Sequence, residues 1–343
     1  MDKINSYFSV VILFSFVALI LSTLFIKIYI LLAKKLKFFS TPHQGGVRQD
    51  IIPTSGGISF GLIYIVMILI LNVFHELPQA YLLSIIIGSS LMLITGFIDD
   101  IYSLSSIIRL IIQLIFVILV LFLFDTQNSF HKNIDYILVF PTIIFGSIWI
   151  INTFNFIDGA DGLVSTNSAI FSFVGGIYLL LTNELVLASS LFILSAVNIG
   201  FLFFNWSPAK IFMGDSGSLF LGSLFVIFMI GSYSQGSNMY WVWLTLLSIF
   251  YVETSVTLFV RIWRKENVFS VHHSLHAYQQ TIINSGKHSR PALISILINL
   301  IWTVPMSFLS FAYPEYGALI VLVTCLPLSL AFYFYGPHQT KQI

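Results

Sequence analysis

Long apolar runs recur along the whole chain and constrain its fold more than any other feature. A bilayer core of about 30 Å is spanned by roughly 20 apolar residues in a helix. Runs of this kind occur eleven times, at residues 7–33, 54–74, 80–98, 106–124, 135–151, 163–182, 184–204, 216–232, 239–261, 291–312 and 316–336. The pattern therefore predicts an all-α polytopic membrane protein with about 11 transmembrane helices in one bundle.

Composition and connections agree with this prediction. Only 8% of the residues are charged and 57% are hydrophobic, whereas about 25% are charged in soluble domains. The first run is too long for a signal peptide core, so we interpret it as a retained span. Breaks such as "HELPQ" and "YPEYG" are short, which indicates one integral membrane domain over residues 1–343. Cys325 is the lone cysteine, which excludes an intramolecular disulfide.

The distribution of Lys and Arg predicts the orientation, because basic residues accumulate in cytoplasmic loops. With the N-terminus outside and the C-terminus cytoplasmic, the outer side keeps only Lys3 and Lys132. Lys27 lies in the inner half of the first span, where it can snorkel inward. The cytoplasmic side then holds Lys34, Lys35, Lys37, Arg48, Arg109, Lys210, Arg261, Arg264, Lys265, Lys287, Arg290 and Lys341.

Five aspartates fall on the same predicted cytoplasmic face. Asp99 and Asp100 end the third run, Asp158 and Asp161 follow the fifth, and Asp215 follows the seventh. Carboxylates gathered at membrane ends repel one another unless a cation or a cationic pocket compensates them. We therefore expect a cytoplasmic active site with a divalent metal, built from loops at about residues 34–53, 99–106, 152–162, 205–215 and 262–290.

The motifs that carry these acids have simpler explanations as well. In "NTFNFIDGADGL", Asn155, Asp158 and Asp161 are three apart, which places them on one side of a helical turn. Helix capping accounts for one or two of these residues, but not for all three. The pair in "GFIDDIYSL" also fits a solvated helix end, and Asp215 in "FMGDSGSLFLG" also fits an N-cap.

Basic residues on this face are candidates for binding phosphate oxygens. Three histidines of "VHHSLHAYQQ" suit zinc, but the abundant oxygen ligands suit Mg²⁺ or Mn²⁺ better. An arginine inside a span is costly unless it faces a pocket or an anionic headgroup. The candidates are His43, Arg48, Arg109, His272, His273 and His276.

The ordered set "IPTSGGISF", "GFIDD", "NTFNFIDGADGL", "FMGDSGSLFLG" and a His-rich last cytoplasmic loop resembles the polyprenyl-phosphate N-acetylhexosamine-1-phosphate transferases. The resemblance runs from about residue 40 to 290. The family includes enzymes that start O-antigen, common antigen and teichoic acid linkage units, and the peptidoglycan lipid I synthase. "HHSLHAYQ" departs from the "HxHH" of many relatives and is closer to the "HRSHAYQ" of a branch devoted to O-antigen and capsule initiation.

The resemblance implies roles for individual residues. Asp215 and Asn155 would hold Mg²⁺, with Mn²⁺ as a substitute, on the donor's diphosphate. Asp99 and Asp100 would lie near the lipid phosphate, for which Asp99 is a proposed base. Arg109 would bind phosphate. Asp158 and Asp161 would shape the nucleotide side of the pocket. The catalytic group would consist of Asp99, Asp100, Asp158 and Asp161. The His-rich loop would contact the diphosphate or the sugar.

The resemblance also implies a reaction and a location. An N-acetylhexosamine-1-phosphate would pass from a UDP-sugar to undecaprenyl phosphate, with release of UMP, as the first membrane step of O-antigen or capsule synthesis. The enzyme would lie in the bacterial inner membrane with its site facing the cytoplasm, bind no nucleic acid and form a homodimer by family analogy. The alternatives are a polytopic transporter, which would show midplane charges and repeats, and a zinc-dependent intramembrane hydrolase, which would need a spacing such as HExxH.

Overall fold

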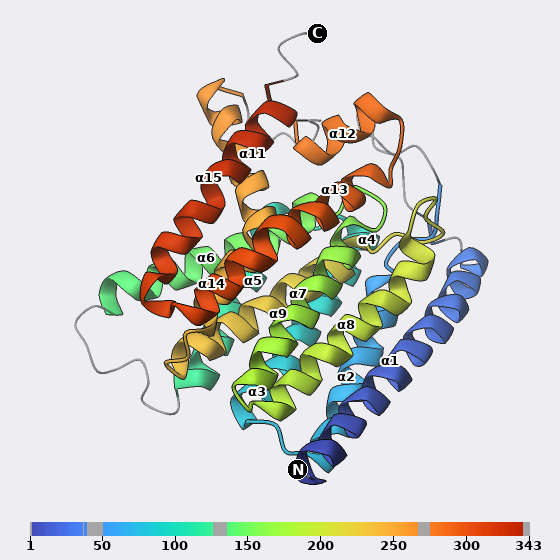
Figure 1. Ribbon diagram of the computed structural model, residues 1–343. Helices are drawn as coiled ribbons and strands as arrows, with labels where there is room; N and C mark the ends of the chain where they lie inside the picture. Colours follow the sequence, from blue (N-terminus) through green and yellow to red (C-terminus); the bar gives the residue numbers. More distant parts are fainter. Residues whose placement is uncertain (1, 37, 40–50, 126–135, 267–274, 339–343) are drawn as a thin grey trace.

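The protein is a bundle of long helices (Figure 1). The computed structural model describes residues 2–36, 38–39, 51–125, 136–266 and 275–338. Ten of the described helical stretches are long and apolar enough to span a membrane, and the pair α10 and α11, bent by 55°, makes eleven. Phe39 and Pro53 form an isolated antiparallel bridge. The predicted all-α class is confirmed, and the ten or eleven candidate spans of the described residues agree with the predicted number of about 11.

The elements follow one another in chain order. Their bounds are α1 Asp2–Lys35, α2 Gly57–Phe74, α3 Gln79–Leu83, the π-helix η1 Ser84–Ser89, α4 Ser90–Tyr102, α5 Ser106–Asp125, α6 Tyr136–Ile157, α7 Leu163–Leu181, α8 Leu185–Asn205, α9 Gly214–Ser234, α10 Met239–Leu246, α11 Ser248–Trp263, α12 Ala277–Ser285, α13 Arg290–Ile298, the π-helix η2 Asn299–Thr303, α14 Val304–Ala312, the 3₁₀-helix η3 Pro314–Tyr316 and α15 Gly317–Tyr335.

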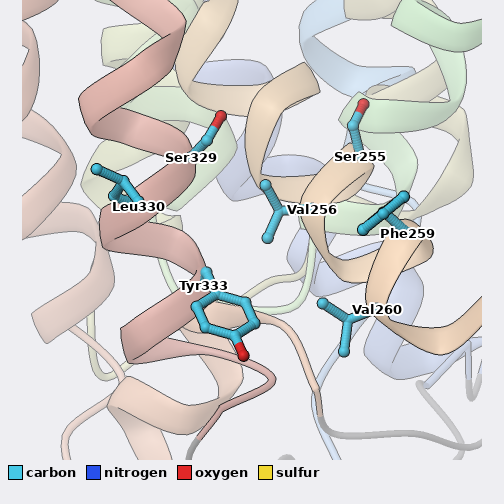
Figure 2. A pocket seen from close by; sticks show the side chains of 7 residues that line it. All are labelled: Ser255, Val256, Phe259, Val260, Ser329, Leu330 and Tyr333. Carbon is cyan, nitrogen blue, oxygen red and sulfur yellow. The ribbon is translucent and has the colours of Figure 1, made fainter. Parts of the chain in front are cut away.

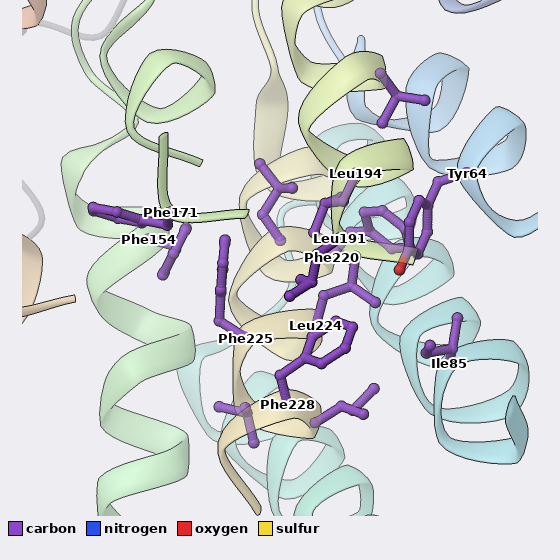
Figure 3. Close-up of a cluster of buried hydrophobic side chains, with 14 of the residues drawn as sticks. Tyr64, Ile85, Phe154, Phe171, Leu191, Leu194, Phe220, Leu224, Phe225 and Phe228 are labelled. Atoms are coloured by element: carbon purple, nitrogen blue, oxygen red, sulfur yellow. The ribbon is translucent and has the colours of Figure 1, made fainter. Parts of the chain in front are cut away.

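Helix α9 is the centre of the bundle. Its span is 89% buried, whereas the spans of α1 and α15 are only 22% and 17% buried. Phe220, Leu224, Phe225 and Phe228 of α9 point into a cluster that α2, η1, α6, α7 and α8 complete (Figure 3). The ring of Phe225 stacks on Phe154 of α6 with the centroids 5.4 Å apart. The outer helices turn apolar side chains outward, as lipid contact requires.

The direction of the helices places several polar motifs together. Because the spans alternate in direction, α1, α4, α6 and α8 end at the same side of the bundle at which α2, α5, α7 and α9 begin. In Figure 1 this is the upper side, and the start of α1 and the end of α15 lie at opposite sides. Every described acid of the predicted site lies at this end.

The ninth span departs from a simple helix. It breaks at Leu247, between α10 and α11, without a proline or glycine to mark the position. An apolar hollow of about 370 Å³ lies between α11 and α15, with Val256 and Tyr333 projecting into the space between the two helices (Figure 2). Tyr333 is the only ionisable residue among those that line it. The hollow is therefore no candidate for the chemistry of the acidic motifs.

Candidate active site

Four helix ends bring the predicted polar residues together. Asp99 and Asp100 lie in the last turn of α4, Arg109 in the first turn of α5, and Asn155 in the last turn of α6. Asp215 is the second residue of α9. Residues that are more than a hundred positions apart in the chain thus meet at the start of the most buried helix.

Arg109 joins two of the carboxylates. Its Nη1 lies 3.1 Å from Oδ2 of Asp99 and 3.5 Å from Oδ2 of Asp215. The backbone N–H of Leu104 donates to the other oxygen of Asp99 at 2.6 Å, so this buried carboxylate has partners on both oxygens. About a third of each of the Arg109 and Asp215 side chains stays exposed. One guanidinium thus contacts both carboxyl groups.

Asn155 lies on the other side of Asp215. The Asn155 side-chain amide donates to Oδ1 of Asp215 at 2.6 Å and to Oγ of Ser218 at 3.2 Å. The oxygen and nitrogen of an Asn side-chain amide are assigned from its hydrogen-bond partners, so a bound cation would favour the flipped amide, with the oxygen toward the ion. With the amide turned over, Asp215 and Asn155 offer two adjacent oxygen ligands on a partly exposed surface. In proteins generally, Mg²⁺ is held by one or two carboxylates, while water and substrate phosphates fill its remaining positions.

Asp100 holds the start of α9. Its two oxygens accept the backbone N–H groups of Asp215 at 2.8 Å and Ser216 at 3.2 Å. These N–H groups belong to the unpaired donors at a helix N-terminus, where a carboxylate also suits the helix dipole. Gly214 has a φ of +73° and leaves no room for a Cβ, which would lie 2.5 Å from Asp100 Oδ2. Asp100 therefore fixes the backbone that carries Asp215.

The "IPTSGG" motif packs against the same segment. The N–H of Phe212 donates to the carbonyl of Pro53, and the N–H groups of Gly56 and Gly57 donate to the carbonyls of Phe212 and Met213, each at 2.9 Å. Gly56 and Gly57 are therefore in close contact with the residues that precede Asp215.

Asp158 and Asp161 lie just beyond α6. The carboxylate of Asp161 accepts the N–H of Ala209 at 3.2 Å, so it ties the 158–162 turn to the segment that leads into α9. Asn205 joins the same two segments, since it accepts the N–H of Gly162 at 3.1 Å and donates to the carbonyl of Ile211 at 2.9 Å. Asp158 is half-buried at the end of α6. The nucleotide-side roles of both acids remain predictions.

His276 is the one described histidine of the His-rich loop motif. Its Nδ1 lies 2.8 Å from Oε2 of Glu253 in α11. Tyr278, two residues on, donates its hydroxyl to the carbonyl of Phe156 at 3.1 Å. The end of this loop therefore lies against the "NFIDGADG" segment. His43, Arg48, His272 and His273 lie outside the described residues.

Comparison with known proteins gives the family. A family model for glycosyl transferase family 4 matches residues 82–233. A probable undecaprenyl-phosphate N-acetylglucosaminyl 1-phosphate transferase of Bacillus subtilis is 27% identical over 295 residues, which cover 80% of this chain and 77% of that protein. A phospho-N-acetylmuramoyl-pentapeptide-transferase of Staphylococcus aureus is 30% identical over 63% of this chain and 75% of its own length.

This chain belongs to glycosyl transferase family 4. A phospho-N-acetylmuramoyl-pentapeptide-transferase of Prochlorococcus marinus is also similar, with 31% identity over 63% of this chain and 65% of that protein. The resemblance that the five motifs indicated is confirmed. The matched residues of the family 4 model run from the third span to the end of α9, and they include Asp99, Arg109, Asn155 and Asp215.

Sequence reasoning about this family 4 member missed two contributors to the site. Glu253 is a lone acid in an apolar run, and nothing near it in the sequence indicates its partner His276. Gln113 of α5 exchanges side-chain hydrogen bonds with Asn152 of α6. One feature of the sequence could have identified these residues, because each is a polar residue inside an apolar run. Polar residues in membrane spans often make contacts with other helices or have a function.

Proposed function

We propose that the protein transfers an N-acetylhexosamine-1-phosphate from a UDP-sugar to undecaprenyl phosphate. The products are undecaprenyl-diphosphate-sugar and UMP. The observation that carries the proposal is the meeting of Asp99, Arg109, Asn155 and Asp215 at the start of α9 in a member of this family. The Bacillus subtilis relative, which matches 80% of the chain, supports this reaction.

The chemistry needs charge and position more than covalent help. An oxygen of the lipid phosphate attacks the β-phosphorus of the donor, and the bond from that phosphorus to the oxygen bridging to the α-phosphorus breaks, so that UMP leaves with the electron pair. Phosphoryl transfer of this kind is accelerated by positioning and by neutralising phosphate charge. The guanidinium of Arg109, one third exposed, is suited to bind phosphate oxygens.

Asp99 serves this reaction best by orienting Arg109. The two side chains are in contact at 3.1 Å, and the second oxygen of Asp99 is held by a backbone N–H. A lipid phosphate is already largely ionised near neutral pH, so a base adds little to the attack. The contacts of Asp99 with Arg109 and with the N–H of Leu104 therefore support a positioning role.

The metal that the family resemblance implies fits the residues present. Asp215 and Asn155 would hold Mg²⁺, or Mn²⁺ in its place. The bound ion supplies charge neutralisation for the donor's diphosphate and its leaving group. Within the described residues, no three His, Cys, Asp or Glu side chains gather as a metal cluster.

The membrane setting separates the two substrates. The lipid tail reaches the site from the bilayer, and the nucleotide reaches it from the water at the same end of the bundle. We place this end in the cytoplasm, because Lys34, Lys35, Lys210, Lys287 and Arg290 lie there. The protein would lie in a bacterial inner membrane and form a homodimer. Its reaction would belong to O-antigen or capsule synthesis.

The test is direct. Purified protein is incubated with undecaprenyl phosphate, Mg²⁺ and a panel of UDP-linked N-acetylglucosamine, N-acetylgalactosamine, N-acetylquinovosamine and N-acetylfucosamine, and UMP release is measured. We expect release with at least one sugar and only in the presence of the lipid phosphate. No release with any donor, from protein that is folded and monodisperse, would overturn the proposal.

A second donor class has its own support. The Staphylococcus aureus and Prochlorococcus marinus relatives are phospho-N-acetylmuramoyl-pentapeptide-transferases at 30% and 31% identity. They match 63% of this chain, whereas the Bacillus subtilis relative matches 80%. UDP-N-acetylmuramoyl-pentapeptide therefore joins the panel, and we expect it to be a poorer donor than the unmodified N-acetylhexosamines.

A further inference from the structure

The ninth span bends sharply at one buried leucine. Helices α10 and α11 meet at 55°, and Leu247 between them is only 1% exposed. Its ψ of −5° departs from the value of about −42° in a regular α-helix. Sharp kinks arise at proline, at glycine or serine pairs, at π-bulges, or where a side chain enters the hydrogen-bond ladder. The last of these causes applies at Leu247.

Two hydroxyls replace backbone donors at the break. In a continuous α-helix, the carbonyls of Leu244 and Thr245 accept N–H groups from the next turn. Here the hydroxyl of Tyr251 donates to the carbonyl of Leu244 at 2.9 Å. The hydroxyl of Ser248 donates to the carbonyl of Thr245 at 2.7 Å. Unpaired carbonyls are costly inside a membrane, so side chains that satisfy them stabilise the bent form.

Both halves of the broken span are also fastened to neighbouring helices. Thr245 of α10 and Ser310 of α14 share a hydrogen bond between their hydroxyls at 2.8 Å. The hydroxyl of Tyr251 in α11 lies 3.3 Å from Sγ of Cys325 in α15. The angle between α10 and α11 is therefore set by contacts on both sides of the break.

Helix α11 in turn supports the end of α6. The ring of Phe250 meets the ring of Phe154 edge to face, with the centroids 4.9 Å apart. The indole N–H of Trp149 donates to the hydroxyl of Ser255 at 3.0 Å. Asn155 directly follows Phe154 in the chain. A swing of α11 would therefore withdraw support from the helical turn that carries Asn155.

We propose that the ninth span is a locked elbow, in which the hydroxyls of Ser248 and Tyr251 hold α11 at a fixed angle, so that α11 braces the Asn155 end of α6. Ser248 and Tyr251 are positioning residues, which act through α11. The elbow itself is independent of the reaction, whereas its effect on Asn155 rests on the proposed function. A hinge at Leu247 would instead let α11 swing.

The test is a distance measurement between spin labels on α11 and α8, in protein reconstituted into lipid nanodiscs. In a Cys325→Ser background, Trp263→Cys and Phe203→Cys place the labels at exposed positions. Helix α11 has 16 residues and is about 24 Å long, so a swing of about 10° moves its end by about 4 Å. We expect one narrow distance distribution, which Ser248→Ala combined with Tyr251→Phe should broaden or shift by about 4 Å or more.

Thr254→Val is the matched control. The Thr254 hydroxyl also donates to backbone carbonyls, those of Phe250 and Tyr251, but it does so within the unbroken part of α11. This variant should keep the narrow distribution. Tyr251→Phe alone, which keeps the ring and removes one oxygen, should show the change to a smaller extent, and it replaces the double variant if that protein does not fold.

A second measurement tests the brace on α6. We expect Ser248→Ala combined with Tyr251→Phe to raise the Mg²⁺ concentration for half-maximal UMP release about tenfold, because groups that orient a metal ligand contribute about this much to metal affinity. Thr254→Val should leave that concentration unchanged.

The outcomes are distinguishable. An unchanged distance distribution in Tyr251→Phe and in the double variant would overturn the elbow. A changed distribution with a wild-type Mg²⁺ requirement would overturn the brace on α6. If wild-type protein releases no UMP with any donor, the proposed function fails and the effect on Asn155 fails with it, while the distance measurement still decides whether the elbow is locked.

Discussion

Asp215 is the residue on which the other polar groups converge. Arg109 approaches one of its oxygens, Asn155 the other, and Asp100 holds its backbone N–H. Asp215→Asn keeps the size of the side chain and removes its charge. We expect kcat for UMP release to fall by about 10²–10³-fold, as when one electrostatic contact to a transition state is removed, while the unfolding temperature in detergent stays near that of wild type.

The control for this prediction is another carboxylate. Glu184 lies between α7 and α8, at the opposite end of the bundle, and is exposed. Glu184→Gln should keep wild-type rates. Normal turnover in Asp215→Asn would contradict the assignment of Asp215 to the metal and the donor.

Metal removal tests the same pair of residues by another route. Asp215 and Asn155 offer oxygen ligands, which hard cations prefer. We expect a chelator to abolish UMP release and Mg²⁺ or Mn²⁺ to restore it in the wild-type protein. In Asp215→Asn, a higher Mg²⁺ concentration should be needed for half-maximal rate. Restoration by Zn²⁺ alone would revive the hydrolase alternative.

Between elements, one amide pair sets how α5 and α6 face each other. Gln113 and Asn152 exchange two side-chain hydrogen bonds, at 2.6 and 3.3 Å, inside the membrane span. Gln113 is one turn from Arg109 and Asn152 one turn from Asn155, so the pair aligns two site residues. Such bonds contribute about 0.6 kcal/mol on average and up to about 1.7.

We therefore expect Gln113→Leu and Asn152→Leu each to lower the unfolding free energy by about 1 kcal/mol and to reduce the rate of UMP release. The exchanged pair, Gln113→Asn with Asn152→Gln, keeps one long and one short amide and should recover much of both losses. Rates and thermal unfolding in detergent are measured side by side. If the exchanged pair is no better than the single Leu variants, the alignment role is wrong.

The approach of α4 to α9 depends on a glycine. A Cβ on Gly96 would lie 2.2 Å from the backbone oxygen of Asp215. Gly96→Ala should therefore displace the start of α9, destabilise the protein by about 1–3 kcal/mol as overpacking does, and lower activity. Gly146→Ala is the control, because no atom outside its own helix lies within 4 Å of a Cβ there. Equal activities of the two variants would contradict this account.

Hydropathy predicted the elements well because each span must cross the same thickness of lipid. The eleven runs all correspond to helices, but the 55° bend at Leu247 was not predictable from a continuous apolar run without proline or glycine. For the site, residue type and the predicted side of the membrane indicated that Asp99, Asn155 and Asp215 lie together, and the structure brings them together at the start of α9. Their roles stay predictions. Asp99 contacts Arg109, whereas Asp100 accepts the backbone N–H of Asp215. This difference depends on the tertiary structure and could not be predicted from two adjacent aspartates.

At the scale of the whole molecule, the start of α1 and the end of α15 lie at opposite ends of the bundle, as an odd number of membrane spans predicts. The basic helix ends gather on the side of the site, where Lys34, Lys35 and Arg290 lie. Positive residues stay in the cytoplasm during insertion. In the proposed orientation, the end of the bundle that carries the site faces the cytoplasm, where UDP-sugars are made.

This orientation can be measured with single cysteines, because the chain has one native cysteine, Cys325. In Cys325→Ser a hydroxyl replaces the thiol, whose Sγ lies 3.3 Å from the hydroxyl of Tyr251. In that background, Lys287→Cys and Glu184→Cys place thiols at exposed positions on opposite sides. A membrane-impermeant maleimide added to intact spheroplasts should label Glu184→Cys only, and inverted vesicles should reverse the pattern. The opposite labelling would place the site outside the cytoplasm and remove its access to UDP-sugars.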